Sequence, residues 1–291
     1  MREFSYYRPS TVTEALALRE RLGEGGAYLN GGTDLVVRIK EKLEQPRYII
    51  DLKGIAELKT FRVAEKRVFI GSTVTLQEVS SSPEINKDFP GLKEAVSSIG
   101  SYQIRVRGTL AGNLISSAPS ADTAPILLCY EAEVLSEGSG GERNIKLSSF
   151  FKGPRLNALE PGEIVKGVFV PRPIFPHLST YLKIGRRASV DLAVAGVAAM
   201  VLDTPSGFEY RVALGAVAPT PVRAWQLEGF LRHKVLTPEL LGEAIPLVLE
   251  DVSPIDDVRS SRHYRLEMCK VLTKRALSSV WERLLLSREV A

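Results

Sequence analysis

A cluster of three prolines constrains the fold of this chain more than any other single feature. The segment Pro171–Pro176 reads PRPIFP. Proline lacks a backbone N–H and fixes φ, so this segment cannot continue a helix or a central strand. The chain has 291 residues, which is enough for two domains of ordinary size. We therefore predict a domain boundary near residue 173.

The composition is that of a globular protein. Hydrophobic residues make up 44% and charged residues 25%, which excludes wholesale disorder. The longest apolar run, 192–202, is too short to span a bilayer. The first residues contain no apolar signal-peptide core. We expect a cytoplasmic protein without a membrane span.

The charge balance gives no sign of a nucleic-acid partner. The net charge is +4, and no basic run is interleaved with aromatic residues. We interpret the basic residues near the C-terminus as the solvated face of a helix. They include Arg259, Arg262, Arg265, Lys270, Lys274, Arg275 and Arg283.

Cysteine and histidine are too scarce for a metal centre on this chain. The two cysteines, Cys129 and Cys269, cannot build a four-cysteine zinc or iron–sulfur site. The three histidines are widely scattered. We expect no metal site on this chain.

The first 60 residues alternate between helical and extended patterns. A capping-box pattern at Thr11–Glu14 predicts a helix through Leu22. A strand at 27–30, a helix at 35–44 and a buried strand at 48–50 follow. This order predicts a βαβ-like beginning.

Further elements follow beyond residue 58. We predict strands at 67–71 and 72–76, a helix at 92–98, a turn-rich segment at 108–119, a helix from about 122 to 130 and a hairpin around 138–141. After the prolines we predict strands at 180–184, 193–202 and 210–216, then helices near 224–231, 238–249 and from about 261. The run 193–202 fits a helix as well as a strand.

Two glycine-containing turns are the candidate binding elements. The first is Asn30–Leu35 (NGGTDL), where a strand runs into a helix. The second is Gly108–Asn113 (GTLAGN), followed by small polar residues and Asp122. Glycines let the backbone approach a ligand and aim its N–H groups at it, which suits a diphosphate held from two sides. Each turn by itself also fits simple chain reversal, and Asp122 also fits a helix N-cap.

The residues of both turns resemble a known family. Asn30–Leu35 resembles the A-G-G-T-D-L segment of the FAD-binding subunits of molybdenum hydroxylases, the xanthine dehydrogenase and carbon monoxide dehydrogenase types. Gly108–Asn113, continuing to Pro125, is similar to their R-G-T-I-G-G-N segment with its later proline and aspartate. Asn30 and Ala111 depart from that pattern. Further similar segments are Phe4–Pro9, Phe150–Gly153, Gly162–Val165, Tyr181–Arg187 and Asp191–Ala193.

The resemblance implies an α+β fold over nearly the whole chain. Residues 1–173 would form the two-subdomain FAD-binding fold of the vanillyl-alcohol oxidase (PCMH) type, with subdomains of about 1–57 and 58–173. Residues 178–287 would form a small α+β domain like the C-terminal domain of the carbon monoxide dehydrogenase flavoprotein.

The resemblance also implies the residues that bind FAD. Two loops would wrap the diphosphate, Asp122 would bind the cofactor, Ile164 or Val165 would pack near the isoalloxazine, and Lys183 would lie near its polar edge. For Lys183, a surface strand lysine is the alternative. The loop residues are Ala27, Tyr28, Leu29, Asn30, Gly31, Gly32, Thr33, Asp34, Thr109, Leu110, Ala111, Gly112 and Asn113.

The function implied is electron transfer without an acid, base or nucleophile on this chain. FAD would accept electrons from 2Fe-2S clusters on a small partner subunit and pass them to NAD⁺ or another acceptor. The molybdenum–pterin cofactor would lie on a large subunit, in a dimer of heterotrimers. Two alternatives stay open: a self-contained FAD-dependent oxidoreductase of the same fold, and a non-catalytic nucleotide-binding scaffold subunit.

Overall fold

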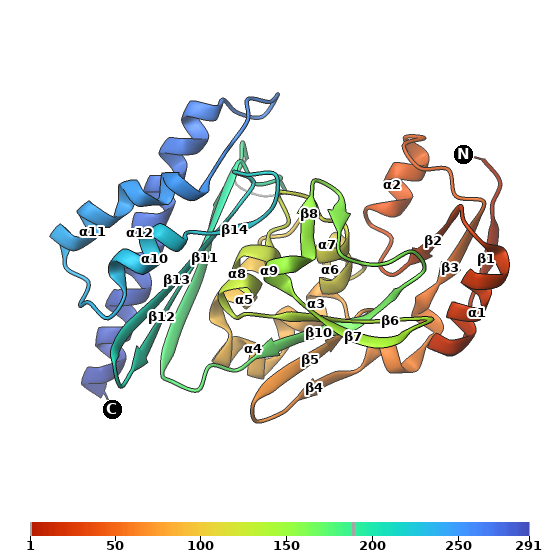
Figure 1. The fold of residues 1–291 in the computed structure, drawn as a ribbon, viewed down its shortest axis with the longest axis horizontal. Helices are drawn as coiled ribbons and strands as arrows, with labels where there is room; N and C mark the ends of the chain where they lie inside the picture. Colours follow the sequence, from red (N-terminus) through yellow and green to blue (C-terminus); the bar gives the residue numbers. More distant parts are fainter. Residues whose placement is uncertain (1, 188–189, 291) are drawn as a thin grey trace.

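The computed structural model describes residues 2–187 and 190–290. Its elements form three parts that follow one another along the chain and across the view in Figure 1. A small sheet at the N-terminus is followed by a larger antiparallel sheet with helices and by a C-terminal sheet covered by helices. No helix in the described ranges is long and apolar enough to cross a membrane.

The N-terminal part is a three-stranded parallel sheet in the order β1-β3-β2. Its elements are β1 (Ser5–Tyr7), α1 (Val12–Leu22), β2 (Gly26–Leu29), α2 (Leu35–Lys40) and β3 (Tyr48–Asp51). The hydroxyl of Thr11 accepts a hydrogen bond from the N–H of Glu14 and so caps α1. The parallel pairing of β2 and β3 across α2 confirms the predicted βαβ-like beginning.

Four predicted elements differ from the structure. The predicted helix at 238–249 is α-helical only over Pro238–Ala244 and continues as a 3₁₀ helix over Ile245–Asp251. Helix α2 ends at Lys40 and not at Glu44, because Lys42 adopts a left-handed φ of 62° that a helix cannot continue. The predicted strand at 72–76 is wrong, since Thr75 and Glu78 form a capping box that begins helix α3 (Leu76–Ser81). Part of the turn-rich segment 108–119 is helical, as α7 (Leu110–Ile115).

The middle part is a five-stranded antiparallel sheet in the order β4-β5-β10-β6-β7. Its strands are β4 (Phe61–Val63), β5 (Arg67–Gly71), β6 (Glu133–Gly138), β7 (Gly141–Lys146) and β10 (Ile164–Pro171). The pairing of β6 with β7 confirms the predicted hairpin. Short elements surround the sheet: η1 (Leu52–Gly54), η2 (Ala56–Lys59), α4 (Pro83–Asp88), α5 (Pro90–Ser97), α6 (Tyr102–Arg105), α8 (Thr123–Cys129), α9 (Leu147–Phe150), β8 (Phe151–Gly153) and β9 (Leu156–Asn157).

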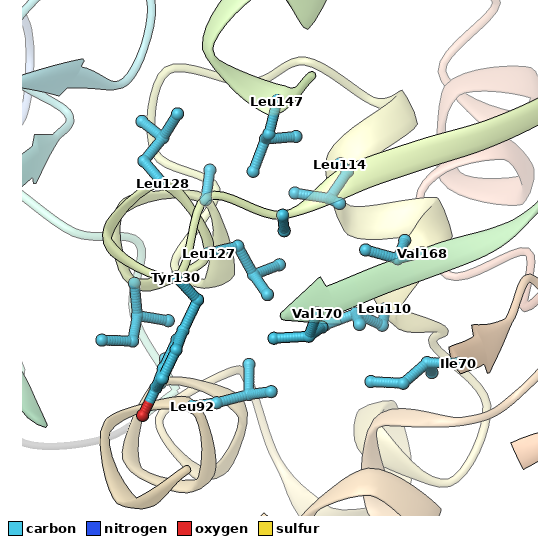
Figure 2. Packing of buried hydrophobic residues seen from close by; sticks show 14 of the residues in the cluster. Ile70, Leu92, Leu110, Leu114, Leu127, Leu128, Tyr130, Leu147, Val168 and Val170 are labelled. Carbon is cyan, nitrogen blue, oxygen red and sulfur yellow. The ribbon is translucent and has the colours of Figure 1, made fainter. Parts of the chain in front are cut away.

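A hydrophobic core lies between this sheet and its helices. Figure 2 shows side chains from the strands facing side chains from the helices. The labelled contributors are Ile70 of β5, Val168 and Val170 of β10, Leu92 of α5, Leu110 and Leu114 of α7, Leu127 and Leu128 of α8, with Tyr130 and Leu147. Each fully buried leucine or valine stabilises the fold by roughly 1.5–3 kcal/mol relative to exposure. This core fixes the start of α7, which carries one of the glycine turns.

The C-terminal part is a four-stranded antiparallel sheet in the order β11-β12-β13-β14. Its elements are β11 (His177–Ile184), β12 (Ala195–Thr204), β13 (Gly207–Gly215), β14 (Val222–Arg223), α10 (Trp225–Leu231), α11 (Pro238–Ala244), η3 (Ile245–Asp251) and α12 (Arg262–Val290). The predicted strands are confirmed. Helix α5 contacts β11, and α8 contacts β12, β13 and β14. Helix α10 contacts β13, and α12 contacts β11 and β12.

Strand β12 is buried on both faces, which explains its unbroken apolar run. Alternate side chains point to opposite faces of a strand. Ala198 and Met200 belong to the core shared with the middle part, while Val197 and Val201 belong to a second core under α12. The last helix packs into that second core through an apolar stripe made of Met268, Leu272, Ala276, Val280 and Leu284.

Candidate functional site

A cleft of about 880 Å³ is lined by residues from all three parts of the chain. The N-terminal part contributes the segment 28–35, and the middle part contributes residues of the segments 108–122 and 154–165. The C-terminal part contributes Leu192, a segment at 216–219 and residues between 253 and 265. The cleft therefore brings both predicted glycine turns into one wall.

The first glycine loop, Asn30–Asp34, lines the cleft. Gly32 has a left-handed φ of 79°, which glycine adopts without strain. Within residues 2–187 and 190–290, the hydrogen bonds of the structure leave the N–H groups of Gly31, Gly32, Thr33 and Asp34 without an acceptor. Successive N–H groups of this kind form a concave site for an anion. The loop can thus hold a phosphate-bearing ligand.

The two glycine loops contact each other, although about 75 residues separate them in the sequence. A Cβ at Gly31 would lie 2.1 Å from the carbonyl oxygen of Arg107 and 2.8 Å from the Cα of Gly108. A Cβ at Gly108 would lie 3.3 Å from the hydroxyl of Thr33. Backbone packing this close requires glycine at position 31. The fold therefore places the two predicted loops side by side at the cleft.

Asn30, one departure from the family pattern, ties the first loop to its neighbours. Its side-chain amide donates to the carbonyl of Ser72 at 2.9 Å, and its own carbonyl accepts from Nζ of Lys53 at 3.1 Å. An alanine at this position has no side-chain donor for the Ser72 carbonyl. Asn30 therefore joins the N-terminal part to the middle part beside the cleft.

The second glycine loop is fixed by the start of α7. The Thr109 hydroxyl accepts from the N–H of Gly112 at 3.0 Å and caps the helix. Asn113 accepts from the hydroxyl of Thr123 at 2.7 Å through its Oδ1. Thr109, Gly112 and Asn113 line the cleft, whereas Leu110 and Ala111 are buried in the core.

Asp122 is a buried carboxylate in the wall of the cleft. It occupies the N-cap position of α8, but its side chain makes no capping hydrogen bond there. Its Oδ1 accepts from the hydroxyl of Tyr181 at 2.7 Å, and its Oδ2 lies 3.0 Å from Nζ of Lys183. Burial raises the pKa of Asp122, and the ammonium of Lys183 and the hydroxyl of Tyr181 oppose that rise.

Lys183 does not line the cleft itself but forms an ion pair with Asp122, which does. The Lys183 side chain is only 16% exposed, which excludes the surface-lysine alternative. Besides Asp122, its ammonium donates to the carbonyls of Ser98 at 2.7 Å and Asp191 at 3.2 Å. Lys183 thus joins strand β11 to the wall that carries Asp122.

The start of β10 forms another part of the wall. Glu163, Ile164 and Val165 line the cleft, and the register of β10 against β6 shifts between Val165 and Gly167. The Arg143 guanidinium donates to both carboxylate oxygens of Glu163, at 2.6 and 2.7 Å, and so lowers the pKa of that carboxyl. This pairing fixes the strand segment that presents Ile164 and Val165.

Most of the predicted site residues come together in the cleft. The residues that line it are Tyr28, Leu29, Asn30, Gly31, Gly32, Thr33, Asp34, Thr109, Gly112, Asn113, Asp122, Ile164 and Val165. The other four, Ala27, Leu110, Ala111 and Lys183, do not line it. Ala27 lies inside β2, where neighbouring side chains alternate between faces.

Several lining residues were missed by the sequence reasoning. Arg155 and Glu163 lie next to or within segments quoted for the family resemblance, so a local signal for them existed. Leu192, Ala216 and the residues from Ser253 to Arg265 come from the C-terminal part. Leu192 lies in the segment Asp191–Ala193 quoted for the resemblance, whereas no motif marks Ala216 or the residues after 253, and only the tertiary fold brings those to the cleft.

Arg265 corrects the prediction of a solvated basic helix face. It is buried and lines the cleft. Its guanidinium donates to the carbonyls of Val194 and Ala216 and to the carboxylate of Asp257, at 2.7, 2.8 and 2.7 Å. A guanidinium surrounded by acceptors in this way holds the C-terminal wall of the cleft in place.

Family models cover nearly the whole chain. A model described as the FAD binding domain in molybdopterin dehydrogenase matches residues 2–173, and one described as the CO dehydrogenase flavoprotein C-terminal domain matches residues 180–280. These matches define the class of protein, an FAD-binding flavoprotein. The chain belongs to the family of FAD-binding medium subunits of molybdenum hydroxylases.

Similar proteins align over almost their entire length. The carbon monoxide dehydrogenase medium chain of Hydrogenophaga pseudoflava is 31% identical over 96% of this chain and 98% of its own. A putative xanthine dehydrogenase FAD-binding subunit of Escherichia coli (strain K12) is 32% identical over 94% of each chain. A solved structure of the Hydrogenophaga pseudoflava carbon monoxide dehydrogenase has a TM-score of 0.93 at 32% identity, covering 97% of this chain and 98% of that chain. The predicted α+β FAD-binding fold with a C-terminal domain is confirmed.

Proposed function

We propose that this chain is the flavoprotein subunit of a molybdenum hydroxylase complex. It would accept electrons from 2Fe-2S clusters on a small subunit and pass them to NAD⁺ or another acceptor. A large subunit would carry the molybdenum–pterin cofactor, and two heterotrimers would form the complex. The observation that carries the proposal is the cleft lined by two glycine loops, the first of which has four N–H groups without an acceptor among the described residues, as suits a diphosphate.

The residues of the cleft fit FAD. The loops 30–34 and 109–113 would hold the diphosphate, and Asp122 would accept a hydrogen bond from the cofactor. Ile164 and Val165 offer an apolar surface for the isoalloxazine. When bound, FAD supplies the ability to accept electrons one at a time and to release two together. We assign no acid, base or nucleophile to this chain.

The domain organisation in this proposal follows the sequence prediction. Residues 1–173 would form the FAD-binding domain, with subdomains of about 1–57 and 58–173, and residues 178–287 would form the C-terminal domain. The cleft lining supports a shared role, since Leu192, Ala216 and Arg265 lie in its wall together with residues of the first 173. The C-terminal domain would thus complete the cofactor site and position it for the partner subunits.

Purification of the full complex from its native host tests the function. We expect one FAD per copy of this chain, together with a large molybdenum-containing subunit and a small iron–sulfur subunit. Anaerobic reduction of the iron–sulfur clusters should then bleach the flavin absorbance. A chain that purifies alone and takes up no FAD would contradict the proposal.

A further inference from the structure

Arg155 lines the cleft beside the first glycine loop. It lies between β8 and β9, and its guanidinium is 3.8 Å from the carboxylate of Asp34. Both residues line the cleft, and both side chains are about half exposed, at 52% and 56%. This ion pair links the middle part to the loop whose N–H groups lack acceptors.

The backbone of Arg155 is held in an unusual conformation. Its φ of 62° lies in the left-handed region, which non-glycine residues rarely adopt. Its N–H donates at 2.9 Å to the carbonyl of Ser117, a buried residue that is also left-handed with a φ of 46°. The surrounding structure therefore fixes the backbone of Arg155 in the wall of the cleft, and with it the point from which its side chain extends.

Among the described residues, the cations that line the cleft are Arg38, Arg155, Arg259 and Arg265. Arg38 pairs with Glu44 at 2.5 Å, and Arg265 is buried among three acceptors. Arg259 belongs to the C-terminal wall. Of these four, only Arg155 forms an ion pair with the first glycine loop. That pair is 3.8 Å long, and both of its side chains are about half exposed. The charge of Arg155 is available to an anion in the loop.

We propose that Arg155 binds the diphosphate of the dinucleotide that the two glycine loops would hold. The inference rests on the proposed function and adds a residue to it. An anion seated on the N–H groups of Gly31–Asp34 would lie beside the carboxylate of Asp34, which repels it. Arg155 would neutralise Asp34 and donate charge-assisted hydrogen bonds to the phosphate oxygens.

The test measures FAD dissociation constants for the full chain by flavin fluorescence. We expect Arg155→Gln to weaken FAD binding about tenfold, or about 1.4 kcal/mol, because one charged donor is lost. The salt dependence of binding should become weaker as well. Lys152→Gln is the matched control, since it removes one exposed charge from β8 outside the cleft lining. It should change the dissociation constant less than twofold.

A second pair of variants separates contact from neutralisation. In an Asp34→Asn background, Arg155→Gln should still weaken FAD binding several-fold if Arg155 contacts the diphosphate. If Arg155 only neutralises Asp34, the two chains bind FAD equally and the proposal fails. It also fails if Arg155→Gln binds FAD like the unaltered chain. If the unaltered chain itself takes up no FAD, the proposed function fails instead. Circular dichroism of each variant confirms that the chain is folded.

Discussion

At the scale of single residues, the site depends on backbone contacts that only glycine permits. Gly31 lies so close to Arg107 that a methyl group at this position would overlap a carbonyl oxygen. Thr109 and Asn113 have side-chain partners that fix the second loop, and Asn30 fixes the first. The motif residues therefore shape the loops at least as much as they offer groups to a ligand.

Substitution of Gly31 tests whether the site depends on the close backbone contact between the two loops. We expect Gly31→Ala to lower the free energy of unfolding by about 1–3 kcal/mol, because the added Cβ forces the two loops apart. FAD affinity should fall at least roughly tenfold, or about 1.4 kcal/mol. Gly242→Ala in α11 is the control, since its Cβ meets nothing within 4 Å. Denaturant unfolding and FAD titration measure both effects, and wild-type affinity in Gly31→Ala would contradict the argument.

Lys183 tests whether a buried cation tunes the bound flavin. Its ammonium sits 3.0 Å from Asp122 in the wall of the cleft. A nearby positive charge favours the negatively charged reduced flavin, so Lys183→Met should lower the reduction potential of bound FAD. A potentiometric titration measures this shift. Lys152→Met, at an exposed position of strand β8, should leave the potential in place, and an unchanged potential in Lys183→Met would exclude the tuning role.

At the scale of elements, strand β10 presents its first residues to the cleft through an irregular register. The shift between Val165 and Gly167 lets the strand change direction at the cleft wall. Glu163 lies just before this strand. Its carboxylate accepts hydrogen bonds from Arg143 of β7, from the hydroxyl of Ser136 of β6 at 3.1 Å and from the N–H of Glu160. The wall under the proposed isoalloxazine position therefore depends on one carboxylate.

The pH dependence of this pairing follows from the lowered pKa of Glu163. A carboxyl whose pKa is lower in the folded state stabilises the fold above its unfolded value, near 4.5, and loses that contribution as the pH falls through the folded value. We expect Glu163→Gln to lower the free energy of unfolding at pH 7 by about 1–2 kcal/mol. The difference from the unaltered chain should shrink below pH 4.5.

An exposed glutamate near the same arginine provides the control. Glu160 is 4.0 Å from Arg143 with 74% of its side chain exposed, so Glu160→Gln should cost at most about 0.5 kcal/mol. Urea unfolding between pH 3 and 7 compares the three chains. A pH-independent effect of Glu163→Gln would show that its charge does not stabilise the wall.

Local patterns predicted most elements, and tertiary contacts decided the others. The Thr11 cap of α1 and the hairpin at 138–141 are encoded within a few residues, and the structure has them. The apolar run of β12 was ambiguous because burial on both faces removes the alternation that identifies a strand. The glycine loops carried recognisable residues, whereas Arg265 had no local signal, since its acceptors at Val194 and Ala216 are distant in sequence.

At the scale of the whole molecule, the cleft joins parts that have separate cores. One core lies largely in the middle part and extends onto β12, a second lies under α12, and a small third lies in the N-terminal part. The N–H of Ala216 donates to the carbonyl of Pro119 at 2.7 Å, which connects the C-terminal wall to the segment after the second glycine loop. A ligand in the cleft therefore contacts elements that belong to different cores.

This arrangement predicts that FAD stabilises the C-terminal part, although both glycine loops lie far from it in the sequence. The two tryptophans, Trp225 and Trp281, lie in α10 and α12, so tryptophan fluorescence reports unfolding of that part alone. FAD at a hundred times its dissociation constant stabilises the folded state by about 2.7 kcal/mol. We expect the tryptophan-monitored midpoint in urea to rise together with the midpoint from circular dichroism. If FAD moves only the circular dichroism midpoint, the C-terminal wall does not contribute to the cofactor site.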